Sequence, residues 1–150
     1  MSTMSINVQN TVYWTYDTGL TDILKWRSEG MNIVVGGQIA KQEVAELIEK
    51  HKGNLDVTIS VKGDLAAAND IKNGNADYYF GACHTGGGGA LAMAIAILGR
   101  GKTASVSNPG KVMPEEKIRE EVRNGKIAFG FTGQDREKVI PIILDEISKL

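Results

Sequence analysis

This chain of 150 residues contains only 1 Cys and 3 Pro, and its 17 Lys or Arg residues nearly balance its 18 Asp or Glu residues. The single cysteine, Cys83, rules out an internal disulfide and fits a reducing compartment. Because the net charge is -1 and no block of Lys or Arg occurs, we expect no nucleic-acid partner and no adhesion to an anionic membrane.

Long apolar runs and a secretory signal are also absent. The longest apolar stretch, Ala90–Leu98, is far shorter than the roughly 20 residues that span a bilayer. The N-terminus shows no basic region followed by an apolar one. With 42% hydrophobic and 23% charged residues, the sequence predicts a folded cytoplasmic protein of one domain, without direct membrane insertion.

The first 30 residues differ in composition from the rest, since they hold both tryptophans, Trp14 and Trp26. Two interpretations stay open for residues 1–30. They form an N-terminal arm, with a strand at 12–16 and helical turns at 21–27, that packs on its own domain or on a neighbouring subunit. Alternatively, they are a non-native extension and Met31 is the true start. Residues 31–150 are expected to be a single α/β domain.

From Met31 onward, short apolar strands alternate with helical segments. The expected strands are 33–35, 55–61, 76–82, 103–106 and 127–131. The expected helices begin at Gln38, Asp64, Gly87, Pro114 and Asp135, with Pro141 bending or shortening the final one. This alternation predicts an α/β fold, a three-layer Rossmann-like sandwich of about five parallel strands in the order 2-1-3-4-5.

Four consecutive glycines, residues 86–89, stand between the third expected strand and the helix after it. Glycine is costly in a helix, so such a run indicates positive φ angles or a ligand close to the main chain. Unpaired N–H groups at a helix start suit phosphate or carboxylate. The predicted site has two walls at the carboxyl ends of the first and third strands. Its ligand-binding residues are Gly36, Gly37, Gln38, Thr85, Gly86, Gly87, Gly88 and Gly89.

Two residues at the head of this loop, Cys83 and His84, are candidate catalytic groups. A thiol at a helix start has more thiolate character and acts as a base or nucleophile, and His84 could transfer a proton or hold an anion. The alternative is that Cys83 is a small buried residue and His84 a turn residue. Ser107 and Asn108 follow the fourth strand and could bond a polyol. No nucleotide fingerprint occurs, so we expect no cofactor and no metal.

The third helix predicts an oligomer. Every residue of Ala90–Leu98 is apolar, so both sides of the helix need cover. One side packs on the sheet, and we expect the other to meet a second copy of the chain. The alternative is cover by the arm of the same chain.

The stretch from Met31 to Leu150 resembles a bacterial family of unknown function, the YhfU-like proteins. The resemblance is carried by 77–79, 81–83, 85–86, the Ala-rich helix, 109–110 and 125–130. A second family, named for its glycine-rich S-F-C-G-S motif, is similar around Cys83. The resemblance implies a cytosolic component of a transport or catabolic system that handles a small, phosphorylated metabolite.

A weaker resemblance is to the type-B ribose-5-phosphate isomerases, carried by Asp77, Tyr78, Cys83, Thr85, Gly86, Gly88 and Ala92. It implies that Cys83 is the proton-abstracting base and that loop amides stabilise an enediolate. His84 stands where that family has glycine, and the loop after the first strand lacks its Asp-His pair.

Three hypotheses for function follow. The first is a cytosolic binding protein for a small anionic metabolite. The second is an aldose–ketose isomerase with Cys83 as base, and the third is an interaction module that docks on a membrane transporter.

Overall fold

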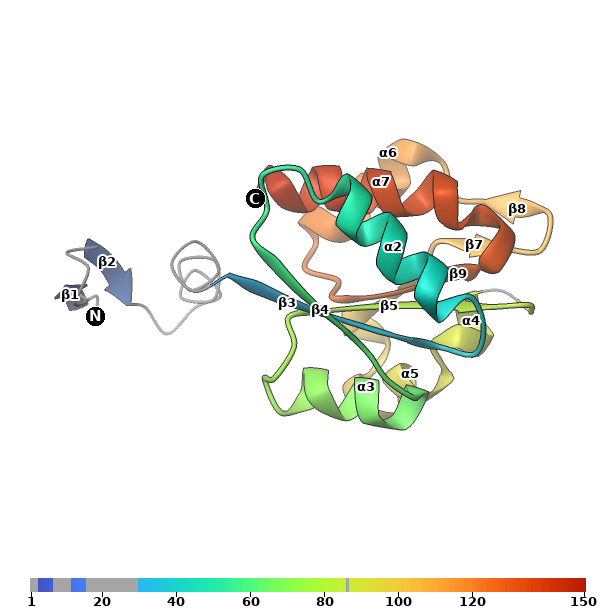
Figure 1. Cartoon of the computed structure of the whole chain (residues 1–150), viewed down its shortest axis with the longest axis horizontal. Coiled ribbons are helices and arrows are strands. Elements are labelled where there is room, and N and C mark those ends of the chain that lie inside the picture. Colours follow the sequence, from blue (N-terminus) through green and yellow to red (C-terminus); the bar gives the residue numbers. More distant parts are fainter. Residues whose placement is uncertain (1–2, 7–11, 16–29, 86) are drawn as a thin grey trace.

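A computed structural model of the chain describes residues 3–6, 12–15, 30–85 and 87–150. The main body is a three-layer α/β sandwich around a sheet of five parallel strands (Figure 1). These strands are β3 (Met31–Gly37), β4 (Val57–Val61), β5 (Tyr78–Cys83), β6 (Thr103–Ser105) and β9 (Ala128–Thr132). The predicted fold class and the parallel sheet are confirmed.

The strands follow the order β4-β3-β5-β9-β6 across the sheet. Ranked by sequence, this order is 2-1-3-5-4: the predicted 2-1-3 part is confirmed, and the last two strands stand in exchanged places. All five residues of β9 are buried, whereas β6 has only three residues. A fully buried apolar strand is stable inside a sheet, and a short strand is suited to its edge.

Helices cover both faces of the sheet. One layer contains α2 (Lys41–His51), α6 (Glu115–Arg123) and α7 (Arg136–Ser148). The other contains α3 (Asp64–Lys72), α4 (Gly87–Ala90) and α5 (Ala92–Leu98). The connections from β3 to β4 and from β6 to β9 run toward the β4 edge of the sheet and pass through the first layer. The connections from β4 to β5 and from β5 to β6 run toward the opposite edge and pass through the second layer, as right-handed crossovers require (Figure 1).

Two helices differ from the sequence prediction. The helix expected from Gly87 is divided into α4 and α5, and Leu91 lies between them. Helix α7 runs through Pro141 to Ser148 and is not shortened there. The carbonyl that loses its N–H partner belongs to Glu137, which is exposed, so water is available to it.

Smaller elements complete the described structure. The short strands β7 (Ser107–Asn108) and β8 (Lys111–Val112) form an antiparallel pair that the sequence did not predict. The 3₁₀ turns are η1 (Arg100–Lys102) and η2 (Gly133–Asp135). In the N-terminal region, β1 (Thr3–Ile6) pairs antiparallel with β2 (Val12–Thr15), where a strand was expected. The helical turns expected at 21–27 lie outside the described residues.

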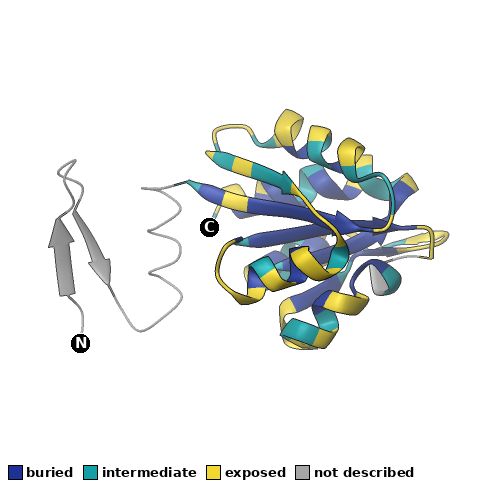
Figure 2. Cartoon of the chain, turned by 60° about the horizontal axis from the view of Figure 1, so that its bottom comes forward, coloured by how far each residue is buried: buried dark blue, intermediate teal, exposed yellow. Residues whose placement is uncertain are grey.

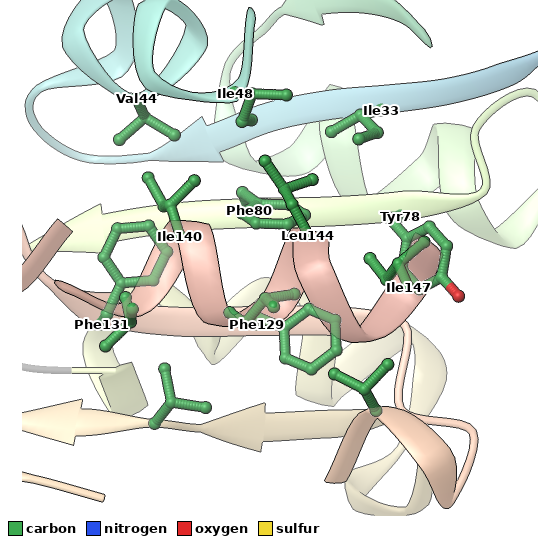
Figure 3. Packing of buried hydrophobic residues seen from close by; sticks show 14 of the residues in the cluster. Ile33, Val44, Ile48, Tyr78, Phe80, Phe129, Phe131, Ile140, Leu144 and Ile147 are labelled. Carbon is green, nitrogen blue, oxygen red and sulfur yellow. The ribbon is translucent and has the colours of Figure 1, made fainter. Parts of the chain in front are cut away.

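Side chains of the central strands alternate between two cores. Phe80 of β5 packs against Phe129 of β9 on the α2 and α7 side, with ring centroids 5.8 Å apart (Figure 3). Tyr79, between Tyr78 and Phe80, faces the α3 and α5 side. Figure 2 shows the inner strands buried and the outer faces of the helices exposed. No helix among the described residues is long and apolar enough to cross a membrane.

Candidate functional site

The carboxyl end of β5 places Cys83 beneath the glycine loop. Its side chain is buried, with 1% of its surface exposed. The backbone N–H of Thr85 donates a hydrogen bond to Cys83 Sγ at 3.3 Å, and Thr85 Oγ1 lies 3.0 Å from the same sulfur. The thiol also donates to Gln38 Oε1 at 3.5 Å. The structure therefore brings together three of the predicted site residues, Gln38, Cys83 and Thr85.

Two glycines of the predicted site, Gly36 and Gly89, are required by packing within the chain. A Cβ at Gly36 would lie 2.6 Å from Tyr79 Cε2. A Cβ at Gly89 would lie 2.5 Å from Thr85 Oγ1 and 2.8 Å from Cys83 Sγ. Gly87 and Gly88 lie at the beginning of α4, a helix of four residues, and Gly86 is outside the described residues. Close approach of side chains thus accounts for Gly36 and Gly89 without a ligand.

The end of β3 is folded over the end of β5. Gly37 has a φ of +83°, and a Cβ there would lie 2.5 Å from the backbone nitrogen of Ala82. The N–H groups of Gln38 and Ile39 both donate to the carbonyl oxygen of Ala82, at 2.9 and 3.3 Å. These contacts hold the end of β3 against the end of β5.

A cavity of about 310 Å³ lies at the carboxyl edge, past the ends of β5 and β9. It is lined by Ile39, Ala40, Cys83, His84, Thr132, Gly133, Gln134 and Arg136. Two predicted catalytic residues, Cys83 and His84, therefore meet in one cavity. Two further lining residues lie at helix starts: Ala40 is the N-cap of α2, and Arg136 is the first residue of α7.

One basic side chain, that of Arg136, and the start of helix α2 lie at this cavity. Arg136 Nη1 donates to the Gly133 carbonyl oxygen at 2.6 Å, and no carboxylate of the described residues forms an ion pair with its guanidinium. Helix α2 begins at the cavity wall without a side-chain cap. The acidic residue of its first turn is Glu43. His84 is exposed. Sequence reasoning missed Arg136; its place directly after the last strand and the turn of η2 was the available signal.

Ser107 and Asn108, the predicted polyol ligands, differ in how far they are buried. Ser107 is buried, and its Oγ accepts a hydrogen bond from the Thr132 N–H at 2.8 Å. Asn108 is exposed in the β7–β8 turn. Asp135, expected as a helix cap, makes no side-chain bond to the α7 backbone; it accepts from Thr132 Oγ1 at 2.5 Å. The Ser107 hydroxyl thus stabilises the end of β9 through its hydrogen bond with Thr132.

A second hollow, of about 680 Å³, lies between the C-terminal ends of α2 and α7. Its charged residues are largely neutralised by protein partners: Lys52 pairs with Glu49, and Asp145 pairs with Arg119 and Lys149. It also lies at the amino end of β3, whereas ligands of open α/β sheets bind beyond the carboxyl ends. The smaller cavity is therefore the candidate site.

The helix predicted to form an oligomer contact has one buried and one open side. Ala90, Leu91 and Ala94 are buried against the sheet and α3. Met93 of α5 has 38% of its surface exposed. Contact with a second copy through this side stays a prediction.

The sandwich and its carboxyl-edge cavity define a small α/β protein with a hollow at the end of a parallel sheet, which is where ligands of open α/β sheets bind. The chain belongs to the family described as "Protein of unknown function DUF2620", which matches residues 31–147. This match confirms the family suggested by the sequence resemblance.

Two similar proteins are described as uncharacterized. "Uncharacterized protein YhfU" of Escherichia coli strain K12 is 37% identical over 89 residues, which cover 59% of this chain and 76% of the relative. The protein of the same description from Shigella flexneri matches with the same figures. No solved structure matches the chain significantly.

Proposed function

We propose that this chain binds a small anionic metabolite, of the phosphate-ester class, in the cavity at the ends of β5 and β9. The observation that carries the proposal is the guanidinium of Arg136, which lines the cavity without a carboxylate partner among the described residues. A guanidinium retains several free N–H donors in a planar fork that matches phosphate oxygens.

The dimensions and surroundings of the cavity support this class of ligand. A volume of about 310 Å³ is at the lower limit of ligand pockets, so it suits a compact metabolite better than a dinucleotide. Ala40 and Arg136 bring the starts of helices α2 and α7 to the wall, and the first N–H groups of a helix, which lack intrahelical partners, attract an anion. Following the resemblance to the YhfU-like proteins, we place this binding protein in a transport or catabolic system in the cytoplasm.

Thermal-shift screening against sugar phosphates, followed by calorimetric titration, tests the proposal. A ligand at 100 times its Kd adds about 2.7 kcal/mol to the free energy of unfolding. Arg136→Gln should weaken binding at least tenfold. Lys138→Gln, at an exposed position of the same helix, should leave affinity unchanged. Equal affinity of both variants and the wild type would contradict the site.

A second candidate, the aldose–ketose isomerase, is favoured by the surroundings of Cys83. The N–H of Thr85 points to Cys83 Sγ, and the Thr85 hydroxyl lies at hydrogen-bonding distance, so two donors are available to a thiolate. Cys83 also lines the cavity, so a substrate bound there would lie beside it. If the chain is an isomerase, Cys83→Ser should abolish turnover of aldose phosphates and retain their binding. For a binding protein, neither the wild type nor this variant should show turnover.

A further inference from the structure

The outer edge of β4 pairs with no strand of the described structure. Strand β4 pairs with β3 on one side and ends the sheet on the other. Its residues are Val57, Thr58, Ile59, Ser60 and Val61, so the strand contains no charge and no proline. Charged residues and proline normally protect natural edge strands from pairing with other chains. The composition of β4 is therefore that of a strand that pairs on both sides.

The hydrogen bonds to β3 show which backbone groups of β4 point outward. The carbonyl oxygen of Asp56 accepts from the Met31 N–H at 2.8 Å, and the Lys62 N–H donates to the Val35 carbonyl oxygen at 3.0 Å. Backbone groups alternate in direction along a strand, so the even-numbered residues of this segment face β3. The N–H and C=O groups of Val57, Ile59 and Val61 consequently face away from the sheet.

We propose that β4 pairs antiparallel with β4 of a second copy of this chain, about a two-fold axis at Ile59. In this register, Val57 lies opposite the partner's Val61, Thr58 opposite the partner's Ser60, and Ile59 opposite the partner's Ile59. Each outward-facing residue then exchanges two hydrogen bonds with its opposite residue. The strand reads the same in residue class from both ends, so apolar side chains meet apolar ones and hydroxyls meet hydroxyls.

Charges at the ends of β4 fit the same register. Asp56 precedes the strand and Lys62 follows it, so each carboxylate lies opposite the partner's ammonium group. Both residues are exposed, and Asp56 has no ion pair among the described residues. Lys62 pairs with Asp70 of α3 and retains 41% exposure of its side chain. A two-fold axis repeats this complementarity at both ends of the contact, which favours a second copy over an unrelated partner.

The packing around β4 leaves room for the partner strand. Helix α3 lies over β3 and β5. Thr58, on the α3 side of β4, is exposed. Helix α2 covers the opposite face, where Val57 and Ile59 are half-buried in the larger core. Edge pairing would therefore join two five-stranded sheets into one continuous sheet without displacing a helix.

Light scattering coupled to size-exclusion chromatography of the full chain tests the pairing. The wild type should elute with the mass of a dimer. Asp56→Lys places Lys opposite the partner's Lys62 and should raise the dimer dissociation constant at least tenfold. Adding Lys62→Glu to this variant restores opposite charges and should restore the dimer. A monomeric wild type, or a dimer unaffected by Asp56→Lys, would overturn the proposal.

Amide hydrogen exchange, followed by NMR, provides a second measurement that needs no variant. The amides of Val57, Ile59 and Val61 should be protected only at concentrations that populate the dimer. Those of Thr58 and Ser60 bond β3 and should be protected at every concentration. Protection of all five amides in a monomer would also overturn the proposal, because another part of the same chain would then cover the edge.

Discussion

The backbone N–H of Gly37 donates a hydrogen bond of 3.0 Å to the hydroxyl oxygen of Tyr79, and both groups are buried. The same hydroxyl donates to the carbonyl oxygen of Ala90 at 2.9 Å. One phenol thus connects the end of β3 to the end of α4. Burial, followed by the nearby charge of Asp64, raises the pKa of Tyr79 well above its ordinary value, so the hydroxyl stays protonated and able to donate.

Removal of this hydroxyl should destabilise the fold. In Tyr79→Phe, the ring stays in place while the Gly37 N–H and the Ala90 carbonyl lose a buried partner. We expect a loss of about 1–3 kcal/mol in the free energy of unfolding, measured by urea denaturation. The urea dependence of that free energy should not change, because the same surface is exposed on unfolding. An unchanged unfolding midpoint would show that the two backbone groups find other partners.

The space around the Tyr79 ring depends on Gly36. A Cβ at this position would lie 2.6 Å from Tyr79 Cε2, so Gly36→Ala forces the ring or the strand to shift. Overpacking of this kind costs about 1–3 kcal/mol. Gly101→Ala is the matched control, since no atom outside its immediate neighbours lies within 4 Å of the added Cβ. Thermal unfolding should distinguish the two variants, and equal melting temperatures would contradict the proposed crowding.

Much of the fold follows from local sequence signals. The apolar runs that become β3, β5 and β9 are separated by amphipathic segments, and this alternation predicts a parallel sheet. Apolar runs did not predict that β9 lies inside the sheet and β6 at its edge. The order of these two strands depends on which of them buries both faces. Nor did local pattern reveal the β7–β8 pair, in which two residues on each side of Pro109 and Gly110 make the contact.

The candidate site was predicted in part. The glycines near Cys83 drew attention to the carboxyl end of β5, and Cys83 and His84 line the cavity there. The reason for two of those glycines is different from the predicted one, since Gly36 accommodates Tyr79 and Gly89 accommodates Thr85 and Cys83. Arg136 joins the cavity only because α7 begins beside α2, a long-range packing relation that residue spacing does not encode.

An ion-pair cluster between α6 and α7 predicts the response to acid. Glu146, 5% exposed, accepts hydrogen bonds from Arg119 and Arg123, each at 3.0 Å. The Arg119 hydrogen bond, more than any other interaction, holds the pKa of Glu146 below its ordinary value. A lowered pKa in the folded state gives stability that is complete above the ordinary Glu range and is lost as the pH falls through the folded value.

We therefore expect Glu146→Gln to be less stable than the wild type at pH 7 and to approach it as the pH falls below about 4. Chemical denaturation between pH 7 and pH 3 measures this convergence. Glu137→Gln, on the same helix and without an ion pair in the described structure, should follow the wild-type curve. A constant difference between Glu146→Gln and the wild type would argue against the ionised pair.

The open side of α5 gives a separate prediction about assembly. If a second copy covers this side, Met93→Lys places a charge in an apolar contact and should dissociate the assembly. Gln42→Lys, exposed on α2 in the opposite layer, is the matched control. Analytical ultracentrifugation measures the outcome. Loss of assembly in Met93→Lys, with no effect of Asp56→Lys, would assign the contact to α5 and exclude the β4 edge.

The interior place of β9 constrains the order in which the chain completes its sheet. Strand β6 pairs with β9 alone among the described strands, although β9 is made more than twenty residues later. During synthesis, Thr103–Ser105 therefore has no strand to join until Ala128–Thr132 has left the ribosome. The first three strands can assemble as the chain emerges, whereas β6 and the helix α6 that follows it must wait for the C-terminal end of the sheet.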